Sequence, residues 1–177
     1  MKSAMLVLLV FLLAAGPAVS QTFDDTLIVP GVRIGKWTLK MTIDDLLRMN
    51  GPVNPVLFNA GSGQTLDARQ DVWVYGWLLQ ALGAVTIDRK TIEVLVAGDG
   101  GRVVPFKTDR GITLHQSRRR SILAVYGKPT AALKASYGQS ELIYEKIGLG
   151  FRVYDDGGQI QAIYVFRPGK AKSFWKF

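Results

Sequence analysis

Residues 37–52 read WTLKMTIDDLLRMNGP, and residues 112–129 read ITLHQSRRRSILAVYGKP. In both stretches a short strand ending in Thr-Leu precedes a hydroxyl residue, Thr42 or Ser117, and then a short helix. A hydroxyl at this place accepts a hydrogen bond from the first turn of a helix, so both residues are predicted N-caps. Gly51 and Gly127 favour the left-handed conformation that ends a helix. The sequence therefore predicts one helical unit twice.

Three short strands are predicted after each helix. They span residues 71–75, 84–88 and 91–97 in the first copy and 141–144, 149–154 and 159–166 in the second. The run Asp155-Asp-Gly-Gly158 is typical of a hairpin turn. The predicted fold class is therefore α+β, as two tandem copies of a short helix packed on an antiparallel three-to-four-stranded meander.

The same pattern divides the chain into five segments. We expect a signal peptide at 1–20, the first helix-plus-sheet repeat at 21–98, a glycine-rich linker at 99–101, the second repeat at 102–168 and a basic-aromatic tail at 169–177. Each half is too small to bury much surface alone, so the halves should share a sheet or a packed interface.

The repeated motif also resembles a known fold. A glycine-containing strand, a Ser or Thr N-cap, a short helix, Gly-x-Pro and a hairpin are shared with beta-lactamase inhibitory protein and the SmpA/OmlA-like outer-membrane assembly lipoproteins. Residues 111–168 match best, and the resemblance covers most of the chain after residue 20. It implies a protein that binds other proteins and does not catalyse. The chain departs from both groups in having no cysteine for a lipid anchor or for disulfides.

The first twenty residues have the parts of a secretory signal. Lys2 gives a positive start, the run AMLVLLVFLLAA is uncharged, and Ala18-Val-Ser20 supplies small residues for cleavage. We expect cleavage after Ser20. An uncleaved anchor is the alternative, but the apolar run is shorter than the roughly 20 residues that span a bilayer. The predicted location is periplasmic or secreted, without a lipid anchor.

Charge indicates the class of partner. The chain has a net charge of +8, and removal of Lys2 with the signal peptide leaves about +7. Such a charge favours anionic partners, although it can also serve solubility alone. The predicted partner is an unknown protein or an envelope polymer. Nucleic acid is not expected, because export separates the protein from it and the basic residues form no stripe.

Aromatic residues are the candidate partner-binding side chains. Trp73, Tyr75 and Trp77 alternate along one predicted strand and so share a face, and Tyr144 is the counterpart in the second copy. Large aromatics are common anchors in interfaces. The alternative is that this face packs on the helix and the aromatics belong to the core.

The C-terminal tail mixes lysines with aromatics. Its candidate contacts with a membrane or an anion are Lys170, Lys172, Phe174, Trp175 and Lys176. The aromatics could enter the bilayer interface while the lysines contact lipid headgroups, which makes peripheral membrane contact the second prediction. The alternative is a tail folded back on the domain through Phe174 and Trp175.

Residues for catalysis are sparse. His115 is the only histidine and cysteine is absent, which excludes thiolate and multi-histidine metal sites and any triad without His115. The carboxylate pairs Asp24-Asp25, Asp44-Asp45 and Asp155-Asp156 fit structural roles. We therefore predict no catalytic residue, no cofactor and no metal.

Together these patterns predict an exported, non-catalytic binding module that engages a protein or envelope component through an aromatic sheet face. The alternative is an envelope-associated structural protein attached to an anionic membrane by its tail. A carboxylate-based hydrolase is a remote third reading, since it needs only two acids across a cleft.

Overall fold

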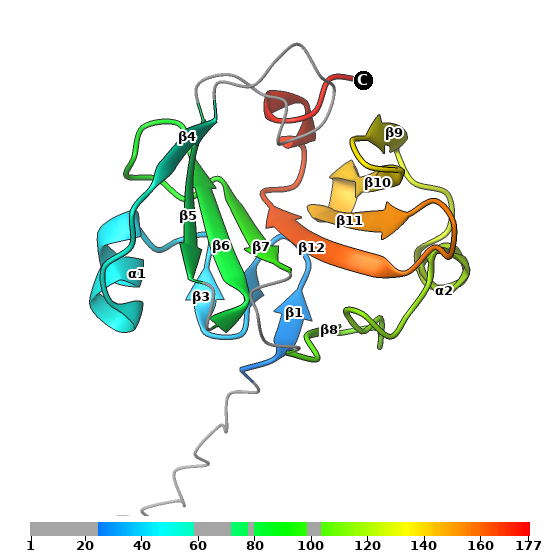
Figure 1. Cartoon of the computed structure of the whole chain (residues 1–177), viewed down its shortest axis with the longest axis horizontal. Helices are drawn as coiled ribbons and strands as arrows, with labels where there is room; N and C mark the ends of the chain where they lie inside the picture. The colour runs from blue at the N-terminus through cyan, green and yellow to red at the C-terminus, as the bar shows by residue number, and fades with distance from the viewer. Residues whose placement is uncertain (1–24, 59–71, 78–79, 99–103) are drawn as a thin grey trace, which may run out of the picture.

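Eight antiparallel strands form one continuous sheet in the computed structural model, which describes residues 25–58, 72–77, 80–98 and 104–177 (Figure 1). In spatial order the strands are β4 (Val56–Phe58), β5 (Val72–Trp77), β6 (Leu82–Thr86), β7 (Val94–Ala97), β12 (Ile160–Phe166), β11 (Leu149–Tyr154), β10 (Gln139–Tyr144) and β9 (Ala131–Ala135). The central pair β7 and β12 joins the two halves of the chain in one sheet. The predicted signal peptide and linker lie outside the described residues.

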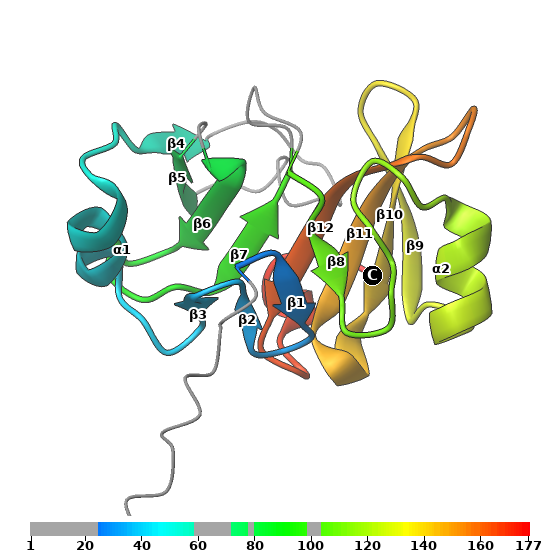
Figure 2. The same ribbon diagram turned by 90° about the horizontal axis from the view of Figure 1, so that it is seen from below.

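A second, smaller sheet has the order β3-β2-β1-β8. Its strands are β1 (Leu27–Val29), β2 (Arg33–Ile34), β3 (Trp37–Thr38) and β8 (Lys107–Thr108). β1 and β8 are parallel and far apart in sequence, so they tie the start of the first half to the start of the second. Figure 2 shows these strands in front of β7 and β12, on one face of the large sheet.

The two helices begin differently. α1 (Ile43–Asn50) begins at Thr42, as predicted, and Thr42 and Asp45 form a capping box in which each side chain bonds the other's backbone N–H. α2 (Arg119–Tyr126) begins at Arg118, without a side-chain cap. The prediction that Ser117 is the N-cap is wrong. Its hydroxyl lies one residue too early and instead accepts a hydrogen bond of 3.0 Å from the Thr113 N–H.

Both faces of the large sheet are covered. α1, α2 and the small sheet cover one face, where Ile43, Leu46 and Ile122 lie in the larger apolar core. The opposite face has a smaller core, to which the C-terminal turn η4 (Ala171–Ser173) and the residues after it contribute. The mixed α and β content is thus as predicted. A chain with both sheet faces covered leaves its edges, turns and helix surfaces for contacts with other molecules.

Asp88 fixes the turn between β6 and β7. Its carboxylate oxygens accept hydrogen bonds of 2.7–2.8 Å from the backbone N–H groups of Thr91 and Lys90 and from the hydroxyls of Thr91 and Thr86. These bonds, above all the one from the Thr91 N–H, hold the pKa of Asp88 well below its usual value of 3.8. The ionised carboxylate therefore stabilises the folded chain.

We expect Asp88→Asn to destabilise the protein near neutral pH. Because folding depresses the pKa, the carboxylate's contribution is present above about pH 4 and is lost as the pH falls through the pKa of the folded state. The free energy of unfolding in urea should therefore differ less between variant and wild type at about pH 3 than near neutral pH. Asp156→Asn, at an exposed turn carboxylate, is the control. A difference of equal size at both pH values would contradict this role for Asp88.

Candidate functional site

The aromatic residues of β5 share one face, as the alternation predicts, but that face is covered. Tyr75 and Trp77 are buried in the larger core, where the rings of Trp77 and Trp37 meet edge to face with centroids 4.9 Å apart. Trp73 is partly buried, and the guanidinium of Arg89 lies 3.3 Å from the centre of its ring. The prediction that these residues form an exposed binding face is therefore wrong for Tyr75 and Trp77. Alternation shows which residues share a face and not which face is free.

Tyr144 is also a core residue. Its ring packs against Tyr126 and Phe151, and its hydroxyl donates a hydrogen bond of 2.9 Å to the Gly127 carbonyl at the end of α2. Burial raises the pKa of Tyr144 to about 12. The side chain thus attaches α2 to the sheet and is not available to a partner, contrary to the prediction.

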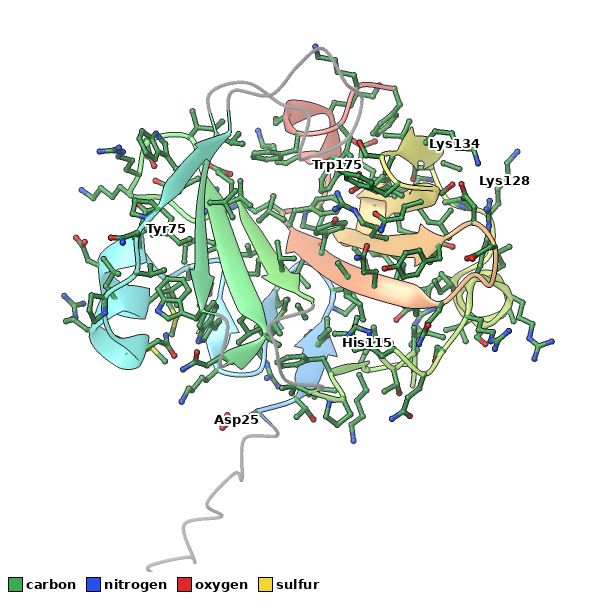
Figure 3. The ribbon with its side chains drawn as sticks, in the orientation of Figure 1. Asp25, Tyr75, His115, Lys128, Lys134 and Trp175 are labelled. Carbon is green, nitrogen blue, oxygen red and sulfur yellow. The ribbon has the colours of Figure 1, made fainter. Side chains whose placement is uncertain are left out.

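The C-terminal tail folds back onto the second half. Phe174 and Trp175 are buried, and the Trp175 ring packs against Phe166, with centroids 4.9 Å apart, and against Tyr164, at 5.7 Å. Figure 3 shows Trp175 between the C-terminal turn and the strands of the second half. The prediction that Phe174 and Trp175 enter a membrane is therefore wrong, because they complete the protein's own core.

The three tail lysines differ from these aromatics. Lys170, Lys172 and Lys176 are exposed. Lys172 Nζ lies 5.7 Å from the ring centre of Phe177, which is itself partly exposed. A contact of the tail with an anion would thus involve its lysines without the two aromatics that the prediction paired with them.

A buried carboxylate holds the tail in place. Glu141, on β10, is 0% exposed. Its Oε2 accepts a hydrogen bond of 2.6 Å from the indole Nε1 of Trp175. Its Oε1 accepts from Arg152 Nε at 3.0 Å, Arg152 Nη2 at 2.5 Å and the Tyr164 hydroxyl at 3.0 Å. Both oxygens therefore have donors from the protein itself, and the ion pair with Arg152 balances the buried charge.

The other polar candidates have structural partners as well. Glu93 Oε2 lies 3.4 Å from Nη1 of Arg167. His115 lies in a turn where its carbonyl accepts a hydrogen bond of 2.7 Å from the Gln159 side chain. In the part of the chain that the structure describes, no three or more His, Asp or Glu side chains are placed to hold a metal ion.

No family model, curated protein or solved structure matches this chain. The chain's own charges and exposed side chains indicate where a candidate site lies.

The positive charge lies in one half of the chain. Residues 21–103 contain eight basic residues (Lys and Arg) and nine acidic residues (Asp and Glu). Residues 104–177 contain thirteen basic and five acidic residues. The net charges of these segments are therefore −1 and +8. An even spread would serve solubility equally well, so the asymmetry indicates that one side of the molecule attracts anions.

Part of this charge surrounds α2 and the outer edge of the large sheet. From its exposed side chains we define the basic surface as Arg118, Arg120, Lys128 and Lys134. Figure 3 shows Lys128 and Lys134 pointing away from the same side of the second half. The first turn of α2 contains no acid to oppose its arginines. Because the helix dipole is positive at that end, a nearby anion would be favourable there.

An exposed aromatic residue lies at the tip of the β9–β10 hairpin. Tyr137 is 92% exposed, more than any other large hydrophobic side chain among the described residues. At the base of the hairpin, Lys134 forms an ion pair of 2.9 Å with Asp155. Hydrogen bonds from Ser140 and Lys134 hold the pKa of Asp155 below its usual range. The sequence interpretation missed Tyr137, although Ser136-Tyr137-Gly138 between two apolar runs indicates a turn with an aromatic at its tip.

Proposed function

We propose that this protein is an exported, non-catalytic binding module that docks onto an acidic protein through the basic surface of its second half. The observation that carries the proposal is the charge asymmetry, in which residues 104–177 hold the whole positive excess of the chain after residue 20. Charges of one sign on one side of a protein raise the rate of encounter with an oppositely charged partner and orient it.

The non-catalytic role draws support from the polar residues. A single histidine and the absence of cysteine leave carboxylates as the remaining candidates for chemistry. Glu141, the most buried carboxylate among the described residues, has protein donors on both oxygens and stabilises the tail. Export draws support from residues 1–20 alone. Among the described residues, no helix is long and apolar enough to cross a membrane.

We further propose that the two halves are copies of one unit. Each half has a helix followed by four antiparallel strands. Counted inward from the two edges of the large sheet, the strands are β4-β5-β6-β7 from one edge and β9-β10-β11-β12 from the other, so each half follows its own chain order toward the centre. The repeated motif around Thr42 and Ser117 supports the same view. Its resemblance to beta-lactamase inhibitory protein and the SmpA/OmlA-like lipoproteins is part of this proposal.

Charge reversal tests the proposed surface. One variant combines Arg118→Glu, Arg120→Glu and Lys128→Glu, and its matched control combines Lys36→Glu, Lys40→Glu and Lys90→Glu in the first half. All six residues are exposed, and each triple change lowers the net charge by six, two for each residue. In affinity capture from the native envelope fraction, we expect the wild type and the control to retain an acidic protein that the first variant loses. Equal retention by all three would contradict the proposal.

A further inference from the structure

Four residues other than glycine have a positive φ in the described part of the chain: Ala81, Arg89, His115 and Tyr137. This region of backbone conformation is unfavourable for side chains with a Cβ, and most of all for bulky ones. Such a residue persists where its surroundings compensate the strain or where its position serves a function. The contacts of each side chain therefore show whether its backbone strain is compensated.

Three of the four have compensating contacts. Ala81 is buried in the larger core. Arg89 places its guanidinium on the ring of Trp73. His115 is partly buried, and its backbone N–H donates a hydrogen bond of 3.2 Å to the Ile160 carbonyl. Tyr137 has φ 59° and a side chain that is 92% exposed, so packing does not offset its strain.

The hairpin tip holds Tyr137 in place all the same. Gly138 follows with φ 66°, and two successive positive φ values are typical of type I′ turns, in which asparagine-glycine is the preferred pair. The Gly138 carbonyl accepts a hydrogen bond of 2.8 Å from the Asp155 N–H, which ties this tip to the neighbouring β11–β12 turn. A tyrosine thus stands where asparagine would be more favourable, on a backbone that this hydrogen bond holds in place.

We propose that Tyr137 is an anchor residue that enters an apolar pocket on an acidic partner protein. The inference rests on the proposed function and adds the residue that enters the partner. A tyrosine ring brings a large apolar area and a hydroxyl with few rotatable bonds, and it loses little entropy when the backbone is already fixed. Tyr137 belongs to the half of the chain with a net charge of +8, so acidic groups around the pocket would find a matching charge on the basic surface.

Stability and binding should respond in opposite directions to Tyr137→Asn. Asparagine tolerates positive φ, so the melting temperature should rise by about 2 °C. The affinity for the acidic protein retained by the wild type should fall by about 30-fold or more, as expected for a central anchor residue. Tyr137→Phe keeps the ring and should retain most of the affinity. Met49→Asn, at an α1 side chain in the first half that is 41% exposed, is the control and should not change the affinity.

A photocrosslinking amino acid at position 137 of the full chain tests the contact in the native envelope. We expect an adduct with the same acidic protein from position 137 and none from position 49. Three results would overturn the inference: no protein adduct at 137, an unchanged affinity of Tyr137→Asn, or a fall in its melting temperature together with its affinity. If Tyr137→Asn binds normally while charge reversal abolishes binding, the proposed function stands without this anchor. If neither change affects binding, both proposals fail.

Discussion

Replacing Trp175 with alanine is expected to lower the free energy of unfolding by about 3–5 kcal/mol. The side chain is 0% exposed, packs against Tyr164 and Phe166, and donates to Glu141. Alanine would leave a cavity in the smaller core and remove the hydrogen bond that Trp175 donates to Glu141 Oε2. Urea unfolding measured by circular dichroism gives the change directly.

Two further variants separate packing from hydrogen bonding in the tail. Trp175→Phe keeps an aromatic ring and removes the indole N–H, so its cost should be smaller, about 1–3 kcal/mol. Phe177→Ala, two residues on at a side chain that is 40% exposed, should change stability by less than about 1 kcal/mol. If Trp175→Ala cost no more than Phe177→Ala, the tail would not be part of the core.

Glu141→Gln is the second large effect we expect, with a loss of about 3–5 kcal/mol. The neutral amide of glutamine cannot balance the charge of Arg152, whose side chain is only 17% exposed. The NH2 group of the amide would also face a hydrogen-bond donor at the place of one carboxylate oxygen. The matched control is Glu93→Gln, since Glu93 pairs with Arg167 where both side chains are more exposed, and its loss should be about 0–1 kcal/mol. Unfolding in urea at neutral pH compares the two.

A double-mutant cycle shows whether the carboxylate and the tail act together. If the Glu141 carboxylate fixes the tail, Glu141→Gln and Trp175→Phe should be non-additive by about 0.5–3 kcal/mol, because both remove the same bond. Strict additivity, or a Glu141→Gln loss as small as that of Glu93→Gln, would contradict the role of Glu141. The carboxylate would then have no special part in closing the second face of the sheet.

Much of the fold could be predicted from local sequence patterns. The capping box of α1 needs only Thr42 and Asp45, three residues apart, and the structure contains it. The predicted strand at 149–154 matches β11, and the other predicted strands overlap β5, β6, β7, β10 and β12. β9 was missed because its sequence, AALKA, is rich in alanine and has little strand propensity. Its position depends on pairing with β10 rather than on its own residues.

The candidate site was harder to predict, for a physical reason. Whether an aromatic residue is core or surface depends on what covers its face, and Tyr75 and Trp77 are covered by segments distant in sequence. The same holds for Glu141, whose donors come from β11, β12 and the tail. The charge of residues 104–177, in contrast, can be counted from the sequence. What required the structure was the exposure and strained backbone of Tyr137.

The association rate between this protein and its captured acidic partner, measured against ionic strength, tests whether the basic surface mediates binding. The wild type and the control with three reversals in the first half should associate quickly at low salt and more slowly as salt is added, because screening weakens attraction between opposite charges. The variant with Arg118→Glu, Arg120→Glu and Lys128→Glu should associate slowly at every salt concentration. Equal rates and equal salt dependence for the two triple variants would contradict a binding surface on the basic half.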